Sequence, residues 1–258
     1  MSNTDLKPDL EQASTMLKAL APSDGAFTFQ TFDDNEFRKK DNLKAWANRG
    51  KTGKKEPFAT VKNGEFSKLE NWLAKQNSQQ AGIFITVNQT DLTGRLEQNI
   101  TGIRAYFVDF DSPKATRLKM LKGLENSGFL SPSLVVETSK NKHHAYWILD
   151  TIDESKTGLE QFSERQNRLI TFFDSLGDTP DESITDLNRV MRLAGYYHQK
   201  EKPAKYGNPA LTGEPFLTKI VYKGRRYEGQ QLNDLIDNLP APLERTSQRQ
   251  ANSKAHTS

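Results

Sequence analysis

Two spacings of apolar residues recur along the chain, one typical of amphipathic helices and one typical of strands. The helical spacing predicts four helices: at the N-terminus, over residues 66–73, over 155–176, and shortly before Pro240. Gly177 is expected to end the third of them. The apolar residues that mark the four helices are Leu10, Met16, Leu17 and Leu20; Phe66, Leu69, Trp72 and Leu73; Leu159, Phe162, Leu169, Phe173 and Leu176; and Leu232, Leu235, Ile236 and Leu239.

Strands are predicted where short apolar runs lie between turn residues. Two of these runs flank the polar segment SKNKHH, and we expect them to pair as a β-hairpin. A shorter helix is expected over 185–193, with Gly195 closing it. The predicted strands are residues 26–32, 83–87, 103–110, 134–138, 145–149 and 216–222.

Composition narrows the class of protein. The 258 residues suit one large domain or two small modules that share a core. We expect this domain to cover 1–240 and a disordered tail to cover 241–258, which has almost nothing to bury. Only 34% of the residues are hydrophobic, and the mean hydropathy is −0.76, which indicates a folded body with polar loops.

Charge and cysteine content bear on partners and location. A net charge of +3 and a pI near 8.9 permit nucleic-acid binding. The absence of cysteine excludes disulfides, thiolate catalysis and iron–sulfur clusters, and favours a cytoplasmic protein. No stretch approaches the ~20 apolar residues of a membrane span, and the N-terminus has no apolar signal segment, so no membrane is expected as a partner.

The segment YFVDFDS, residues 106–112, carries two acids at the end of a predicted buried strand. Side chains two apart in a strand share a face, so Asp109 and Asp111 project together. Neighbouring carboxylates repel each other unless a proton or cation lies between them, and their hard oxygens suit Mg²⁺ or Mn²⁺. The alternative is that the strand ends at Phe110 and both acids lie in a turn.

Two histidines lie at the predicted hairpin. Alternation places His144 and His143 on opposite faces, so that only one of them can share the face of the aspartates. Such an imidazole, and Ser139 on the facing strand, could each donate to a triphosphate oxygen. The alternative for adjacent histidines is an exposed turn.

Further acids and two arginines follow in residues 178–200. Paired guanidiniums suit a triphosphate or a template phosphate, and Arg189 and Arg192 would share a face of the predicted helix. Periodicity does not choose among Asp178, Asp181 and Asp186 as a further metal ligand. An i,i+3 ion pair between Asp186 and Arg189 is the structural alternative.

In this order, VDFD, then a serine followed by HAYW, then RVMRLAG and a lysine resemble the three motifs of the archaeo-eukaryotic primase superfamily, closest to its RepB-type plasmid and phage primases and primase-polymerases. The resemblance spans about residues 80–205. It implies an α/β (α+β) fold, with an N-terminal α/β module packed on an RRM-like sheet and the active site between them.

The resemblance also implies roles for single residues. Asp109 and Asp111 would ligate metal, and Asp181 would be the third carboxylate, with Asp186 in reserve. His144 would be catalytic and bind the nucleotide. The other implied nucleotide-binding residues are Ser139, Arg189, Arg192 and Lys200.

Some positions depart from the pattern. Ala194 stands where many relatives have Pro, and His198 or a neighbour stands where they have Asn. The usual zinc element cannot form without cysteine. No helicase motif follows, so a separate replicative helicase is an expected partner.

These features predict a nucleotidyltransferase that synthesises primers on a single-stranded DNA template from nucleoside triphosphates, for replication of a plasmid or phage. Lysines of residues 39–55 and Lys223, Arg225 and Arg226 are candidate template contacts, although solubility is the alternative explanation for each. A rolling-circle initiator or relaxase is a rival, using the histidines and Tyr196–Tyr197. A non-catalytic single-strand-binding protein is another, with Tyr106, Phe110 and Trp147 stacking on bases.

Overall fold

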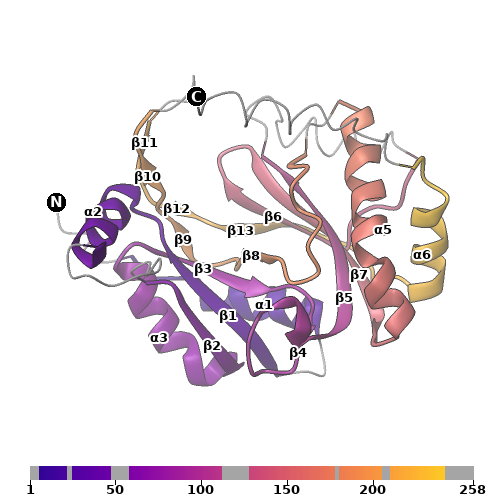
Figure 1. Cartoon of the computed structure of the whole chain (residues 1–258), viewed down its shortest axis with the longest axis horizontal. Helices are drawn as coiled ribbons and strands as arrows, with labels where there is room; N and C mark the ends of the chain where they lie inside the picture. The colour runs from indigo at the N-terminus through magenta and orange to yellow at the C-terminus, as the bar shows by residue number, and fades with distance from the viewer. Residues whose placement is uncertain are drawn as a thin grey trace, which may run out of the picture.

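The computed structural model describes residues 6–21, 25–47, 58–111, 128–177, 180–204 and 210–241. Two antiparallel sheets organise these residues (Figure 1). The first has the strand order β2-β1-β3-β8, and the second has the order β13-β6-β7-β5-β4. Nothing in the tail beyond residue 241 is described, so the prediction of disorder there lies outside the described residues, as do Lys51, Lys54 and Lys55.

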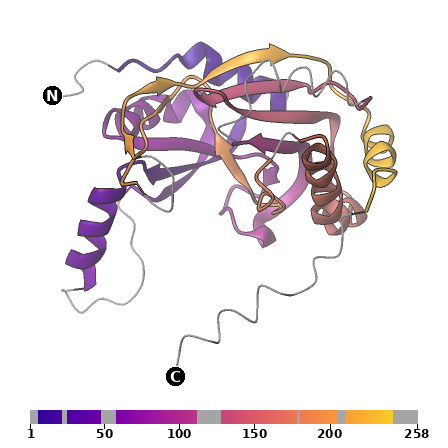
Figure 2. The ribbon, with the colours of Figure 1, turned by 90° about the horizontal axis from the view of Figure 1, so that it is seen from above.

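The first sheet and its helices come mostly from the N-terminal part of the chain. Asp9 caps α1, because its side chain accepts a hydrogen bond from the Gln12 backbone at 3.1 Å. Helix α3 packs on this sheet, with Phe66 against Phe29 of β1. Figure 2 shows α2 projecting from this end of the molecule, far from α5 and α6. The elements are α1 (Leu10–Leu20), β1 (Ala26–Asp33), α2 (Glu36–Ala47), β2 (Thr60–Glu65), α3 (Phe66–Ser78) and β3 (Ala81–Thr86).

The second sheet has one face covered by helices. Phe173 of α5 stacks on Trp147 of β7 at 5.3 Å between ring centres and meets Phe110 of β5 edge-on. Because side chains alternate, the residues between these aromatic positions face away from α5, toward the first sheet. The elements are β4 (Gln89–Thr90), the 3-10 turn η1 (Glu97–Asn99), β5 (Ile100–Phe110), β6 (Leu134–Ser139), β7 (Lys142–Asp153), α5 (Lys156–Ser175), β13 (Lys219–Lys223) and α6 (Gly229–Asp237).

The predicted hairpin is confirmed. Strands β6 and β7 pair antiparallel, with Ser139 opposite Lys142. The two residues between them include Asn141, whose positive φ of 64° is one that asparagine tolerates in a tight turn. This turn fixes which residues of β7 face the first sheet.

The helix predicted over 185–193 is wrong. Residues Val190–Arg192 instead form strand β8, which pairs antiparallel with β3 and buries Met191. The open edge of β3 provides the pairing, and this tertiary contact overrides the local helical spacing. Gly195 does not close a helix: it has a φ of 84°, and its carbonyl accepts the Asp9 backbone N–H at 2.7 Å.

Short strands after β8 bring a third segment against both sheets. The predicted strand at 216–222 is two strands, one pairing with β9 and one with β6. These short strands are β9 (Tyr197–His198), β10 (Glu201–Lys202), β11 (Leu211–Thr212) and β12 (Phe216–Leu217). Among the helices of the described ranges, none has the length and apolar character that crossing a membrane requires.

Candidate active site

The two aspartates lie where β5 ends. Asp109 is opposite His144 of β7, and Phe110 is opposite His143. Directly opposed residues of an antiparallel pair share a face, so Asp109 and His144 project together, away from α5. His144 Nε2 lies 3.6 Å from Asp109 Oδ2, and Asp111 follows the strand at the same end.

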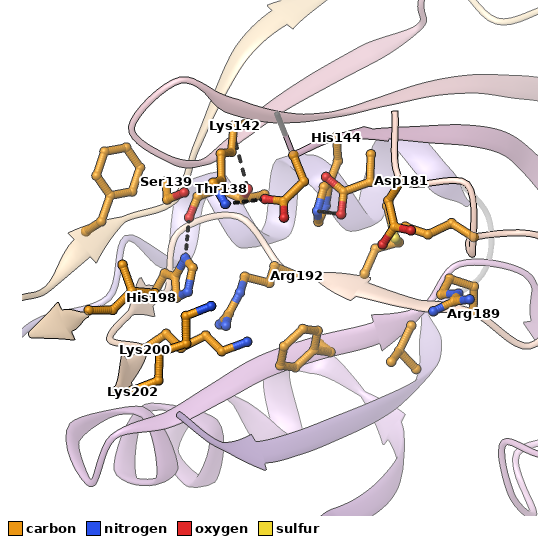
Figure 3. A pocket seen from close by; sticks show the side chains of 18 of the residues that line it. Thr138, Ser139, Lys142, His144, Asp181, Arg189, Arg192, His198, Lys200 and Lys202 are labelled. Carbon is orange, nitrogen blue, oxygen red and sulfur yellow. Dashed lines mark hydrogen bonds and ion pairs between the residues drawn. The ribbon is translucent and has the colours of Figure 1, made fainter. Parts of the chain in front are cut away.

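A pocket of about 390 Å³ lies between the two sheets and brings most of the predicted site residues together (Figure 3). Asp186 does not line this pocket, and Asp178 lies outside the described residues. The predicted residues that line it are Asp109, Asp111, Ser139, His144, Asp181, Arg189, Arg192 and Lys200.

Asp181 lies beside Asp109 although 72 residues separate them in the chain. Its backbone N–H donates to the Asp109 carbonyl at 2.8 Å, and its carboxylate accepts from the Ser183 backbone at 2.9 Å. The side chain is exposed on the pocket wall. Asp186 instead pairs with Arg189 at 2.7 Å, as the structural alternative predicted, although in a turn rather than in a helix.

The tautomer of His144 follows from its neighbours. Burial, followed by the charge of Asp109, raises the pKa of Tyr146 well above its usual value, so this hydroxyl stays protonated. Tyr146 can therefore donate to His144 Nδ1, which lies 3.3 Å away. A carboxylate only accepts, so the approach of Nε2 to Asp109 at 3.6 Å favours a proton on Nε2.

Arg192 is held by a buried partner from the first sheet. Its guanidinium makes two hydrogen bonds to Asp34, at 2.8 and 3.1 Å. Burial alone would raise the pKa of Asp34, but Arg192 reverses that effect and the pKa is lowered. Gly82 makes room for the pair, because a Cβ there would lie 2.6 Å from Arg192 Nη1.

Arg189 is more constrained than predicted. Besides the contact with Asp186, its Nη2 donates to the Ser183 carbonyl at 2.5 Å. The side chain still reaches the pocket wall, where Figure 3 places it close to Asp181. Arg189 and Arg192 both line the pocket, but not as neighbours on one helix face: Arg189 precedes β8 and Arg192 ends it.

Sequence reasoning missed several charged or ionisable residues in the pocket and the buried partner of Arg192. Lys142 pairs with Asp111 at 2.6 Å, and its position two residues before His144 would have placed it on the same strand face. His198 and Lys202 alternate with Lys200, a signal hidden by the helix predicted upstream. Asp34 has no local signal, because its partner is 158 residues away.

The donor set fits a hard divalent cation. Asp109, Asp111 and Asp181 offer carboxylate oxygens, the ligands that Mg²⁺ and Mn²⁺ prefer. Lys142 pairs with Asp111, and a metal ion at Asp111 would replace this ammonium group. Over the described ranges, no three His, Asp or Glu side chains are close enough together to form a complete metal site.

Sequence comparison identifies the family. The profile of the RepB DNA-primase N-terminal domain matches residues 55–213, more than half of the chain. The chain belongs to this family. It is therefore a primase, a nucleotidyltransferase of DNA replication, which confirms the predicted class of enzyme. No curated protein matches the chain significantly.

Solved structures similar to this primase confirm its fold. The AEP domain of the cyanophage S-2L primase-polymerase superposes with a TM-score of 0.60 at 21% identity, covering 90% of this chain and 99% of the other. The catalytic domain of primase RepB′, solved in complex with initiator DNA, gives 0.53 at 16% identity, covering 96% and 100%. The predicted archaeo-eukaryotic primase core is thus confirmed.

Proposed function

We propose that residues 1–240 form one catalytic domain that synthesises primers on single-stranded DNA from nucleoside triphosphates, for replication of a plasmid or phage. One observation carries the proposal: one pocket between the two sheets holds Asp109, Asp111 and Asp181 together with a group of cationic side chains. A metal-bound triphosphate needs both, because the carboxylates attract the cations and the basic groups attract the phosphates.

The fold holds two of the three aspartates in place, and the third would move to join them. Asp109 is fixed by the pairing of β5 with β7, and Asp181 is tied to it through the backbone. Asp111 would leave Lys142 to join them in holding two divalent ions. When bound, such ions activate a 3′-hydroxyl and stabilise the departing pyrophosphate.

The phosphates would be held from both sides of the pocket. His144 offers Nε2–H and Ser139 offers its hydroxyl from the second sheet. Arg189, Arg192 and Lys200 face them from the opposite wall. Arg192 keeps N–H groups beyond those that bind Asp34, since a guanidinium has five.

Basic side chains outside the pocket would contact the template. The RepB′ catalytic domain was solved with initiator DNA, which supports DNA binding by this fold. Lys39, Lys40 and Lys44 lie on α2 and are candidate phosphate contacts. Arg226 is a weaker candidate than the sequence indicated, because it donates to the Ala19 and Asp150 carbonyls. A separate helicase would supply the single strand.

The two rivals meet structural objections. Tyr196 is 1% exposed, so it cannot attack DNA as a relaxase tyrosine does, and Tyr197 is half-buried. His143 and His144 lie on opposite strand faces, so they cannot hold one metal ion together. Tyr106, Phe110 and Trp147 are fully buried and cannot stack on bases.

Primer synthesis by the purified full chain tests the proposal. Labelled nucleotides, single-stranded DNA and Mg²⁺ or Mn²⁺ should give short products with the wild type. Asp109→Ala/Asp111→Ala should abolish incorporation and leave the fold intact. Asp174→Ala, an exposed carboxylate on α5, is the matched control and should keep full activity.

Two results would count against the proposal. Incorporation that persists in the double variant would mean that the pocket is not the active site. A 5′-phosphotyrosine adduct, or single-strand binding without any synthesis by the wild type, would favour one of the two rivals.

A further inference from the structure

One imidazole of the pocket has half of its hydrogen-bonding capacity unused. His198 Nδ1 lies 2.8 Å from the Thr138 carbonyl. A carbonyl only accepts, so Nδ1 must carry a proton and donate. The other ring nitrogen, Nε2, is buried and has no hydrogen-bond partner among the described residues. Buried polar atoms of this kind call for a partner that the free protein does not supply.

The charge of this ring in the empty pocket follows from its surroundings. Burial, followed by Arg192, lowers the pKa of His198 to about 4, with Asp34 and the Thr138 hydrogen bond acting in the opposite direction. At neutral pH the ring is therefore uncharged. Since Nδ1 holds the one proton, Nε2 presents a lone pair.

The charged groups around His198 come from several elements. Figure 3 shows the ring below Thr138, with Arg192 beside it and Lys200 below. Burial, followed by Arg192 and Lys202, lowers the pKa of Lys200, which shows that cations crowd this end of the pocket. The ionisable groups that face this space are Arg192 from β8, Asp34 after β1, Lys142 from β7, Lys200 after β9, Lys202 from β10 and Glu214 before β12.

A triphosphate is the ligand class that suits this arrangement, as the proposed function also requires. Its oxygens are acceptors, so a phosphate oxygen facing the Nε2 lone pair would be repelled. One proton placed on Nε2 turns this repulsion into a charge-assisted hydrogen bond. The negative charge of the ligand also offsets the cations that keep the ring neutral in the empty pocket.

We propose that His198 is a further triphosphate-binding residue, which takes up one proton at Nε2 when the nucleotide enters and donates a hydrogen bond to a phosphate oxygen. The proposal rests on the proposed function, because that function brings the triphosphate to this pocket. The only bond formed is N–H. The proton comes from a buffer acid in the solvent, whose bond to it breaks, and Nδ1 keeps its hydrogen bond to Thr138.

The affinity for the triphosphate should fall as pH rises. The pKa of His198 is about 4 in the empty pocket and higher when the ligand is bound. His198 therefore contributes fully to affinity at low pH, and its contribution falls as pH rises toward the bound-state value. Where the ring is neutral when free and protonated when bound, affinity should fall by about tenfold per pH unit.

Calorimetric titration of the full chain with inorganic tripolyphosphate at pH 7 tests the proposal. Titrations in buffers with different heats of protonation measure the protons taken up. The wild type should take up as much as one proton more than His198→Gln or His198→Ala. His198→Gln should keep most of the affinity, because its amide donates without titrating, whereas His198→Ala should lose about tenfold or more. Thermal unfolding of each variant checks that the fold is kept.

Several outcomes would overturn the proposal. Equal proton uptake in wild type and variants would do so, as would the absence of tripolyphosphate binding by the wild type. A loss of affinity seen with ATP but not with tripolyphosphate would mean that Nε2 accepts from a sugar hydroxyl instead. Primer synthesis is measured in parallel. If the wild type synthesises primers but takes up no more protons than the His198 variants, only this inference is wrong. If it takes up more protons but synthesises no primers, only the proposed function is wrong.

Discussion

His143 and His144 are neighbours in the chain but have different surroundings, because β7 alternates its side chains. His144 lines the pocket opposite Asp109, whereas His143 is fully buried opposite Phe110. The first is placed to contact substrate, and the second belongs to the interior on the α5 side. At the residue scale, function is therefore decided by the strand face.

Replacing each histidine by alanine should separate these roles. His144→Ala should raise the KM for nucleotide by about tenfold or more, because a hydrogen bond to a charged phosphate is lost, and should change Tm little. His143→Ala should lower Tm and leave KM close to that of the wild type, because it leaves a cavity in the core. Steady-state incorporation and thermal unfolding measure both effects. A larger KM effect for His143→Ala would show that the wrong imidazole was chosen.

Strand alternation made part of the site predictable residue by residue. Asp109 and Asp111 were expected on one face with only one of His143 and His144, the resemblance pointed to His144, and the structure brings these two aspartates and His144 into the pocket. The choice among the later acids was open on spacing alone, because Asp181 reaches Asp109 through a contact 72 residues away in sequence. The pairing of Asp34 with Arg192 could not be predicted from strand alternation, because only folding brings these two residues together.

At the scale of elements, β8 differs most from expectation. Leu187, Val190 and Met191 have helical spacing, but the open edge of β3 captures the segment as a strand. The spacing of apolar residues within one segment carries no information about an unpaired strand edge elsewhere in the fold. The other predicted helices had no such competitor, and α1, α3, α5 and α6 all formed.

Gly82 of β3 leaves the space that the ion pair between Asp34 and Arg192 of β8 occupies. Gly82→Ala would put a Cβ 2.6 Å from Arg192 Nη1 and 2.9 Å from Asp34 Oδ1, which forces the ion pair to move. We expect a loss of about 1–3 kcal/mol of unfolding free energy and a raised KM for nucleotide. Denaturant unfolding and steady-state kinetics measure these effects.

Gly229→Ala is the matched control for this substitution. Gly229 begins α6, and its added Cβ would meet nothing within 4 Å. Its stability should therefore be at least that of the wild type, and its KM should be unchanged. If Gly82→Ala behaved like this control, the Asp34–Arg192 pair would not position the phosphate-binding wall.

At the scale of the whole molecule, the pocket exists only because two sheets face each other. Asp109, Asp111 and Lys142 come from the second sheet and Asp181 from a loop, whereas Arg192 comes from β8 and Lys200 from the segment after it. The second sheet alone would lack the arginine of β8 and the lysine that follows it. The resemblance in sequence indicated this arrangement, while the register of β3 with β8 needed the structure.

The central claim is that Asp109 and Asp111 hold a divalent cation against a triphosphate. The most direct measurement is the anomalous density of Mn²⁺ in crystals grown with a non-hydrolysable nucleoside triphosphate. We expect a peak about 2 Å from oxygens of Asp109 and Asp111, with a phosphate oxygen in the same coordination sphere. A nucleotide bound with no Mn²⁺ at these carboxylates, or with Mn²⁺ bound elsewhere, would contradict the account.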